Sequence, residues 1–584
     1  MSTKTPLIFA IAFLTSLAPA SAQPTAAQCI PPDAVICLHL AKPKVLIDQL
    51  ADAEMIEAIT SLPLYQQQVT NPEFKEFLNV IDFLETTLQT NWRTALTQLT
   101  GGGITLAVCP NDTVVAVVDA EDESLLNRLH EIFVNIARSE AQKQGDAERV
   151  ASSQHNGVTM WTFDGNEAHA IIGKRLIFSN RSEMLKATLD LQAQPGGASL
   201  ASSPTFQAAR RATQPDAVAT AFVHLKPLMA LPDFAKIIES PRTNPLASLM
   251  FAGITESLGS SSWLALNLDV QDRTLTLRAL TDGKLAGPDS PAAFALPQQA
   301  GDGVEPGARI PRRIAALSLH RDLHAFYAAK DDLFPERTSG LIFFENMMGI
   351  FFTGRDLTSE VLAQTEPQIQ LVVAEQQYDP DVGTPQVKLP AFAVILRLRD
   401  PEQFGSVVEE AWQKAVGLIN FTRGQQALPG LIIDRPTHRQ TKFTLAYFST
   451  TDVTDKTKLD TRFNISPSLA LPGEYLVLSS TDGLARDLID ALGDTADRQL
   501  APLPQTHSLL EISGTQVASV LQANRDTLVR QDMVKKGKTQ QEAAAGIDML
   551  ITLLKCVDHA ELNIGTENDL TQAALELKLD LPKP

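Results

Sequence analysis

The chain has 584 residues, of which 68 are acidic and 49 basic, so its formal net charge is −19. A hydrophobic content of 44% with only four cysteines is typical of a globular protein, and it excludes a disordered polar chain and a small disulfide scaffold. The excess negative charge repels phosphates, which argues against a nucleic-acid partner.

Residues 1–22 have the layout of a secretory signal peptide. A single charged residue, Lys4, precedes an apolar run from Pro6 to Leu17, and Ala20-Ser21-Ala22 then supplies the small residues that a signal peptidase requires. The run is short for the roughly 30 Å hydrocarbon core of a bilayer, although an uncleaved N-terminal anchor is the alternative. We therefore predict export and cleavage after Ala22, giving a periplasmic or extracellular protein with no transmembrane span in the mature chain.

Residues 29–280 are predicted to form a first α+β domain. Its strands come mainly as hairpin pairs, namely Ile104–Cys109 with Val114–Asp119, Val158–Phe163 with Ala168–Ile172, and Trp263–Val270 with Thr274–Leu280. A helix is predicted over Glu121–Ile136, where apolar residues recur at helical spacing. In the last strand Leu275, Leu277 and Ala279 alternate with polar residues, which predicts one packed face and one solvent-exposed face.

Residues 281–309 have the composition of a linker. This stretch holds five glycines and four prolines, and it has little periodic apolar pattern. The boundary between two domains is therefore predicted to fall here.

Residues 310–581 are predicted to repeat the first domain. The segment Phe178–Asp190 aligns without gaps with Leu478–Asp490, at a displacement of 300 residues, and Leu275–Arg278 recurs as Leu575–Lys578. Such self-similarity indicates an internal duplication. The predicted fold class is α+β, with two tandem homologous copies, each a mainly antiparallel sheet with helices packed on it.

A long helix in the second copy has a clear start signal. Asp400 can serve as the N-cap, Pro401 suits the first turn, and Gln403 completes a capping box. Phe404 and Val408 then begin an apolar stripe at helical spacing.

The four cysteines leave the disulfide state open. Export permits disulfides, and Cys29, Cys37, Cys109 and Cys556 can pair in three ways, among which the sequence does not choose. Cys37 and Cys109 lie in apolar strand patterns, so small buried thiols are an equal alternative. None of the spacings is CxxC, which argues against a zinc or redox site.

Searches for catalytic and cofactor motifs give no site. His130-Glu131 is followed by Val134 where a zinc-binding HExxH helix needs its second histidine. Gly537-Lys538-Thr539 ends like a phosphate-binding loop, but Asp532 replaces its first glycine. We therefore predict no catalytic residue, no metal site and no cofactor.

The segment Leu341–Phe352 is the one candidate interaction surface. Its aromatic and methionine side chains extend beyond one helical face, so part of them is expected to stay uncovered and offer an adaptable apolar surface. Simple burial in the core is the alternative. The candidate residues are Phe343, Phe344, Met347, Met348, Phe351 and Phe352.

Two pairs of segments carry a resemblance to a known family. Residues 354–362 followed by 371–376, and residues 464–468 leading to 475–480, resemble exported bacterial proteins that carry a domain of unknown function. The resemblance implies export and the repeated domain. The family has no assigned catalytic residues, so the resemblance implies no activity.

These observations favour an exported, non-enzymatic binding or structural protein of the cell envelope, with its two copies packed about a pseudo-two-fold axis. Its partner is expected to be an envelope protein or an apolar ligand. The alternative is an extracytoplasmic hydrolase whose site is assembled from dispersed residues, because catalytic triads are defined by geometry rather than by sequence order.

Overall fold

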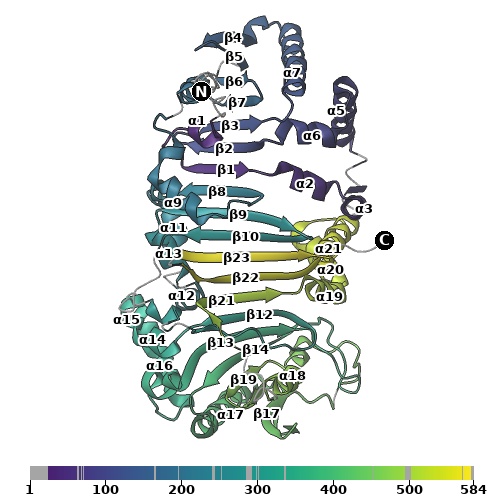
Figure 1. Cartoon of the computed structure of the whole chain (residues 1–584). Helices are drawn as coiled ribbons and strands as arrows, with labels where there is room; N and C mark the ends of the chain where they lie inside the picture. The colour runs from purple at the N-terminus through teal and green to yellow at the C-terminus, as the bar shows by residue number, and fades with distance from the viewer. Residues whose placement is uncertain are drawn as a thin grey trace, which may run out of the picture. The chain divides into compact units, whose positions relative to one another are not determined.

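The computed structural model describes residues 24–61, 65–66, 69, 71–163, 166–194, 196–239, 244–251, 253–283, 292–297, 299, 301–334, 337–451, 453–493, 501–568 and 570–580 (Figure 1). The predicted signal peptide, residues 1–22, lies outside these ranges. The chain divides into two compact units, one formed by residues 1–40 and 95–210 and the other by residues 41–94 and 211–584. This division differs from the two predicted copies, because residues 41–94 and 211–280 group with the second half of the chain.

The first unit is built on an antiparallel sheet. In spatial order its strands are β1 (Ile36–Leu40), β2 (Gly103–Cys109), β3 (Thr113–Asp119), β7 (Arg175–Ser179), β6 (Glu167–Ile172), β5 (Val158–Phe163) and β4 (Val150–His155). The predicted hairpins β2–β3 and β5–β6 are confirmed. The helices that accompany this sheet are α1 (Ala26–Cys29), α7 (Glu123–Lys143), α8 (Ser182–Ala193) and the greater part of α9 (Pro204–Ala212).

Helices pack on both faces of this sheet. Neighbouring residues of a strand point to opposite faces, so their contacts show which helix covers each face. In β7, Ile177 is fully buried in a cluster with Leu185 and Leu189 of α8. Leu176 and Phe178 point the other way and line a pocket together with residues of α7. The first unit therefore has three layers, as expected for an α+β domain whose helices bury both sheet faces.

The second unit contains a longer antiparallel sheet. Its strand order is β8 (Ala219–His224), β9 (Trp263–Gln271), β10 (Thr274–Thr281), β23 (Leu570–Leu579), β22 (Val557–Glu567), β21 (Thr506–Ile512), β12 (Arg313–His320), β13 (Thr365–Ala374), β14 (Ala391–Leu398), β19 (Tyr475–Ser479), β18 (Ser468–Ala470) and β17 (Thr441–Tyr447). Strands β15 (Ile432–Asp434) and β16 (Thr437–His438) both pair with β17. The predicted mainly antiparallel architecture with helices is thus confirmed at the level of fold class.

The helices of the second unit lie before and between these strands along the chain. They are α2 (Pro43–Leu50), α3 (Ala53–Ser61), α5 (Pro72–Leu88), α10 (Leu225–Met229), α11 (Pro232–Glu239), α12 (Pro245–Phe251), α13 (Ile254–Ser260), α14 (Leu323–Ala328), α15 (Lys330–Leu333), α16 (Thr338–Phe351), α17 (Pro401–Gln425), α18 (Asp482–Gly493), α19 (Gly514–Ala523), α20 (Arg525–Lys536) and α21 (Gln540–Lys555); α6 (Trp92–Thr100) spans the boundary of the two units along the chain. The predicted cap of α17 is confirmed, because Asp400 Oδ1 accepts a hydrogen bond from the Gln403 amide at 3.0 Å. Among the helices in the described ranges, none is long and apolar enough to cross a membrane.

Part of the predicted linker, residues 281–309, is folded. The short helical turn η4 (Ala293–Ala295) is buried, and the Phe294 ring packs on Phe326 with 4.8 Å between ring centroids. β11 (Gly303–Val304) pairs with β20 (Leu503–Pro504). The segment therefore contributes to the core where its few apolar residues occur, although its glycine and proline content is that of a loop.

The same order of connections occurs in two stretches of the chain. In the first stretch the neighbouring strands are β1-β2-β3-β7-β6-β5, and in the second they are β12-β13-β14-β19-β18-β17. In both stretches the first three strands are in chain order and the last three are in reverse chain order. β7 begins at Arg175 and β19 at Tyr475, and the helices that follow them, α8 and α18, begin at Ser182 and Asp482. All these starts are displaced by 300 residues, from 175 to 475 and from 182 to 482.

Candidate functional site

Helix α16 carries the predicted apolar surface, and one side of it packs on the core. Leu341 and Met348, together with Phe352 directly after the helix, contact a buried cluster that includes Tyr327 and Phe404. These three positions are spaced seven and four residues apart and therefore form one stripe of the helix. The side chain of Phe352 is thus part of the core rather than of an open surface.

The opposite side of α16 is exposed. Phe343 is 71% and Ile350 70% exposed, and they lie seven residues apart, on the same face. Ile342 is 50% and Phe344 39% exposed, whereas Met347 and Phe351 are only partly exposed. Of the six predicted residues, Phe343 and Phe344 therefore face solvent most. The sequence analysis missed Ile342 and Ile350, although the seven-residue spacing from Phe343 to Ile350 was a signal that could have identified the second.

The exposed face of α16 has no charged side chain at its centre. The one acidic residue of the helix, Glu345, is held by Lys330 at 3.3 Å, and the Lys330 ammonium lies 5.1 Å from the centre of the Tyr327 ring. The exposed residues between Ile342 and Ile350 are apolar apart from Asn346. The exposed face of α16 is therefore apolar and uncharged, in a chain with a net charge of −19.

The neighbouring helix α17 also exposes apolar side chains. The two helices are joined through Lys414, whose ammonium donates to the Phe351 carbonyl at 3.4 Å and, just after α16, to the Thr353 hydroxyl at 2.8 Å. One turn further along α17, Leu418 is 50%, Ile419 45% and Phe421 64% exposed. Exposed apolar residues are thus a property of both helices.

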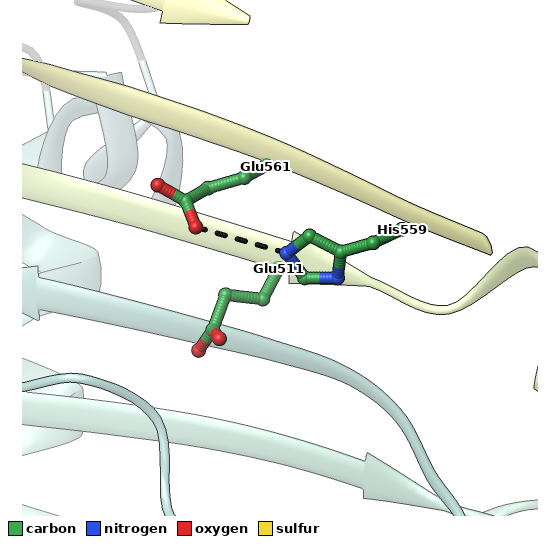
Figure 2. A group of neighbouring side chains, drawn as sticks. All are labelled: Glu511, His559 and Glu561. Carbon is green, nitrogen blue, oxygen red and sulfur yellow. Dashed lines mark ion pairs between the residues drawn. The ribbon is translucent and has the colours of Figure 1, made fainter. Parts of the chain in front are cut away.

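A second group of polar side chains lies on the sheet between β21 and β22. Glu511 is directly opposite Glu561, and His559 lies two residues before Glu561 on the same face. Figure 2 shows the three side chains beside one another, with ligand atoms that all lie within 4.8 Å. His559 Nε2 is 3.7 Å from Glu561 Oε2. Two carboxylates and an imidazole are donors that a divalent cation accepts, so the group needs to be tested as a metal site.

Glu511 is already neutralised within the protein. Its Oε1 accepts from Arg313 Nη2 at 2.8 Å, and its Oε2 accepts from the backbone amide of Gly307 at 3.2 Å. Since both oxygens have partners and the guanidinium supplies the balancing charge, the residues fit an ion-pair network better than a cation site. This group gives no reason to assign a metal.

The first unit contains an apolar pocket of about 230 Å³ between α7 and the sheet, which the sequence analysis did not find. Its lining is Leu126, Leu129, His130, Phe133, Val134, Phe163, His169, Ile171, Leu176 and Phe178. His130 Nε2 and His169 Nε2 lie 2.9 Å apart, so one ring donates and the other accepts. Burial, with the neighbouring His130 as a second cause, lowers the pKa of His169 to about 4. Burial also lowers the pKa of His130, so both rings are predominantly neutral at neutral pH.

The comparisons with known proteins agree with the expected resemblance. Residues 7–284 match the family described as "Protein of unknown function (DUF3352)", which confirms the similarity to a domain of unknown function. No curated protein matches this chain.

Solved structures give only a weak likeness. Crystal form III of TP0453 has 11% identity over 47% of this chain and 85% of that chain, with a TM-score of 0.25. Crystal form I of TP0453 has 12% identity over 47% and 84%, with a TM-score of 0.24. These scores are too low to assign either a fold or a function.

Proposed function

We propose that this chain, whose residues 7–284 match a domain family of unknown function, is an exported, non-enzymatic binding or structural protein of the cell envelope. In this proposal it consists of two tandem homologous copies, over residues 29–280 and 310–581. The surface that it uses for binding is the exposed face of α16.

The duplication is supported by contacts that recur at equivalent positions. His155, the last residue of β4, has its Nε2 2.7 Å from Asp190 Oδ1. His438, the last residue of β16, has its Nε2 2.7 Å from Asp490 Oδ1. Asp190 and Asp490 are the positions that the sequence aligns at a displacement of 300 residues. A shared ancestor explains why the same polar pair links the same strand and helix twice.

The pairing of β10 with β23 supports a pseudo-two-fold axis. Leu275 is opposite Leu577, and Leu277 is opposite Leu575. With the displacement of 300 residues, Thr276 is opposite its own equivalent, Glu576, and the residues on either side of Thr276 pair reciprocally with the equivalents of one another. Reciprocal contacts of this kind are those of a symmetric interface between two equal subunits.

The observation that carries the binding role is the exposure of Phe343 and Ile350. A small apolar ligand needs a concave site that encloses it, whereas these side chains project from the convex side of a helix. An uncharged row of aromatic and branched side chains fits the apolar surface of another protein. We therefore assign an envelope protein as the partner of this face.

A pull-down with the full-length chain tests this role. The double variant Phe343→Ser with Ile350→Ser removes the two most exposed apolar side chains of α16 and leaves the core contacts of Phe352 intact. Capture of the partner from envelope extract is expected to fall by about tenfold or more, because exposed aromatic anchors dominate such interfaces. Val534→Ser is the matched control, since Val534 is 85% exposed on α20. Equal capture by all three proteins would contradict the assignment.

Export is tested separately by the N-terminus of the mature protein. Signal cleavage after Ala22 predicts that the protein isolated from its own cells begins at Gln23 and is recovered with the envelope or extracellular fraction. An uncleaved chain in the cytoplasmic fraction would overturn the location on which the proposal rests.

A further inference from the structure

The second unit has a polar pocket that the binding role described above does not use. It measures about 300 Å³ and lies on the face of β9, β10 and β23, close to the turn between β22 and β23. The polar side chains that line it include Arg211, Gln214, Asn267, Arg278, Glu567 and Gln572. Residues 211–280 and 567–572 belong to the two different proposed copies, so the pocket is made by both.

Asn267 is buried in this pocket without a hydrogen-bond partner. Its side chain is 0% exposed, and neither Nδ2 nor Oδ1 has a partner among the described residues. A buried carboxamide has two donors and an acceptor, and leaving them unpaired costs about 1–3 kcal/mol. A hydrophobic residue at this position of β9 would avoid that cost. We therefore infer that the Asn267 amide forms its hydrogen bonds with a ligand that enters the pocket.

Two guanidinium groups give the pocket a positive character. Arg278 is directly opposite Asn267 on β10 and points to the same face. It has no ion pair among the described residues; its one partner is Gln214, in the amide orientation that satisfies both Arg278 and Asp269. Arg211 is exposed at the rim, likewise without an ion pair in the described part of the chain.

The acidic groups nearby do not cancel this charge. Glu567 is exposed at the rim, as the last residue of β22. The Gln214 amide lies between Asp269 and Arg278. Asp269 Oδ2 accepts a hydrogen bond from the Gln214 nitrogen at 3.1 Å, so Asp269 is bonded to Gln214 rather than to Arg278. The protein as a whole has a net charge of −19, so a general attraction for anions cannot arise from its overall field.

We propose that this pocket binds a small oxyanion, a carboxylate or a phosphate, that carries a further neutral polar group. The Arg278 and Arg211 guanidinium groups pair with the anionic oxygens, as planar forks do with carboxylates and phosphates. Asn267 and Gln572 bind the neutral end, because a carboxamide both donates and accepts. The volume is at the lower end of the range for small-molecule sites, which limits the ligand to the size of a small organic acid or a phosphorylated fragment.

Calorimetric titration of the full-length protein tests the proposal, with inorganic phosphate and succinate as the two probes. Binding of either probe in the micromolar to millimolar range is expected, and the one that binds identifies the oxyanion. Sodium chloride at the same ionic strength is the salt control. No heat of binding with either probe beyond the chloride control overturns the proposal, since the pocket then takes up water only.

Variants assign the binding to this pocket. Arg278→Gln and Arg211→Gln change side chains that are partly exposed or exposed, so the fold is retained, and circular dichroism checks this. Each is expected to weaken binding by about tenfold or more, because each removes a charge-assisted hydrogen bond. Arg128→Gln, an exposed arginine on α7, is the matched control and is expected to bind as the parent does. Unchanged affinity in both pocket variants would contradict the site. Loss of envelope-protein capture is not expected in any of them, so this test is independent of the surface on α16.

Discussion

His438 Nε2 lies 2.7 Å from Oδ1 of Asp490, and the pair joins the short strand β16 to helix α18. The imidazole is 26% and the carboxylate 35% exposed, so the contact is partly shielded from solvent. The Arg439 guanidinium lies 3.0 Å from the same carboxylate oxygen. A second histidine–aspartate pair, His155 and Asp190, has the same 2.7 Å separation.

Replacing either aspartate with alanine is expected to lower stability by a similar amount. Asp190→Ala and Asp490→Ala should each reduce the free energy of unfolding by about 1 kcal/mol, the value of a partly exposed charged hydrogen bond. Urea denaturation measures the change, and Asp82→Ala, exposed on α5, is the control. A clear loss for one aspartate with none for the other would argue against equivalent roles in two copies.

Arg321 is a fully buried cation held by backbone oxygens. It donates to the carbonyls of Leu249 at 2.6 Å, Met250 at 3.0 Å and His507 at 2.9 Å, and burial lowers its pKa to about 9. Arg321→Met removes these donors and leaves buried carbonyls unpaired, so we expect a loss of about 3–5 kcal/mol in unfolding free energy. Arg321→Lys is also expected to be destabilising, because an ammonium cannot reach the same set of oxygens. A methionine variant as stable as the parent in urea would refute this role.

His169 should make the first unit sensitive to acid. Its folded pKa is lowered to about 4 by burial, against about 6.5 in the unfolded chain. The unfolded state therefore binds a proton at a higher pH than the folded state, and stability is lost as pH falls from about 6.5 to about 4, by up to roughly 3 kcal/mol. Urea denaturation across this window measures the slope. His169→Phe, which keeps an aromatic ring beside Phe163, should flatten the profile.

The comparison of the two urea profiles also contains the outcome that contradicts this role of His169. If the phenylalanine variant loses stability with acid as steeply as the parent does, His169 does not carry the effect.

The four cysteines are free thiols with different accessibility. Burial raises the pKa of Cys37 to about 12 and that of Cys109 to about 11, and both side chains are buried. Cys556 is partly exposed. Because the thiolate is the reactive form, a thiol reagent should modify Cys556 first at neutral pH, and Cys37 and Cys109 only when the fold opens. Peptide mass spectrometry after short labelling gives the order, and early modification of Cys37 would contradict the buried placement.

Local features of the fold were predictable because short-range chemistry determines them. The Asp400 cap and the hairpin between Cys109 and Thr113 depend on residues that are neighbours in sequence. The pairing of β10 with β23 depends on strands about 300 residues apart, and no local pattern specifies such a partner. The sequence therefore predicted the type of element and the class of fold, but not the grouping of residues 41–94 and 211–280 with the second half.

Both candidate sites also depend on contacts between residues that are far apart in the sequence. The apolar composition of α16 was visible, but which stripe stays exposed depends on the packing of Met348 and Phe352 against residues elsewhere in the chain. The polar pocket brings together Arg211 and Gln572, which lie far apart along the chain. No local sequence pattern therefore distinguishes its residues from other polar residues. Sites made by non-local contacts are defined by geometry.

Site-specific photo-crosslinking in intact cells tests the proposed function most directly. A photoreactive phenylalanine analogue at position 343 reports both the cellular compartment of the protein and the partner bound to the exposed face of α16. The same analogue at position 534 is the control. We expect a discrete crosslink from position 343 to a protein of the cell envelope and none from position 534. No crosslink from position 343, or crosslinks only to cytoplasmic proteins, would contradict it.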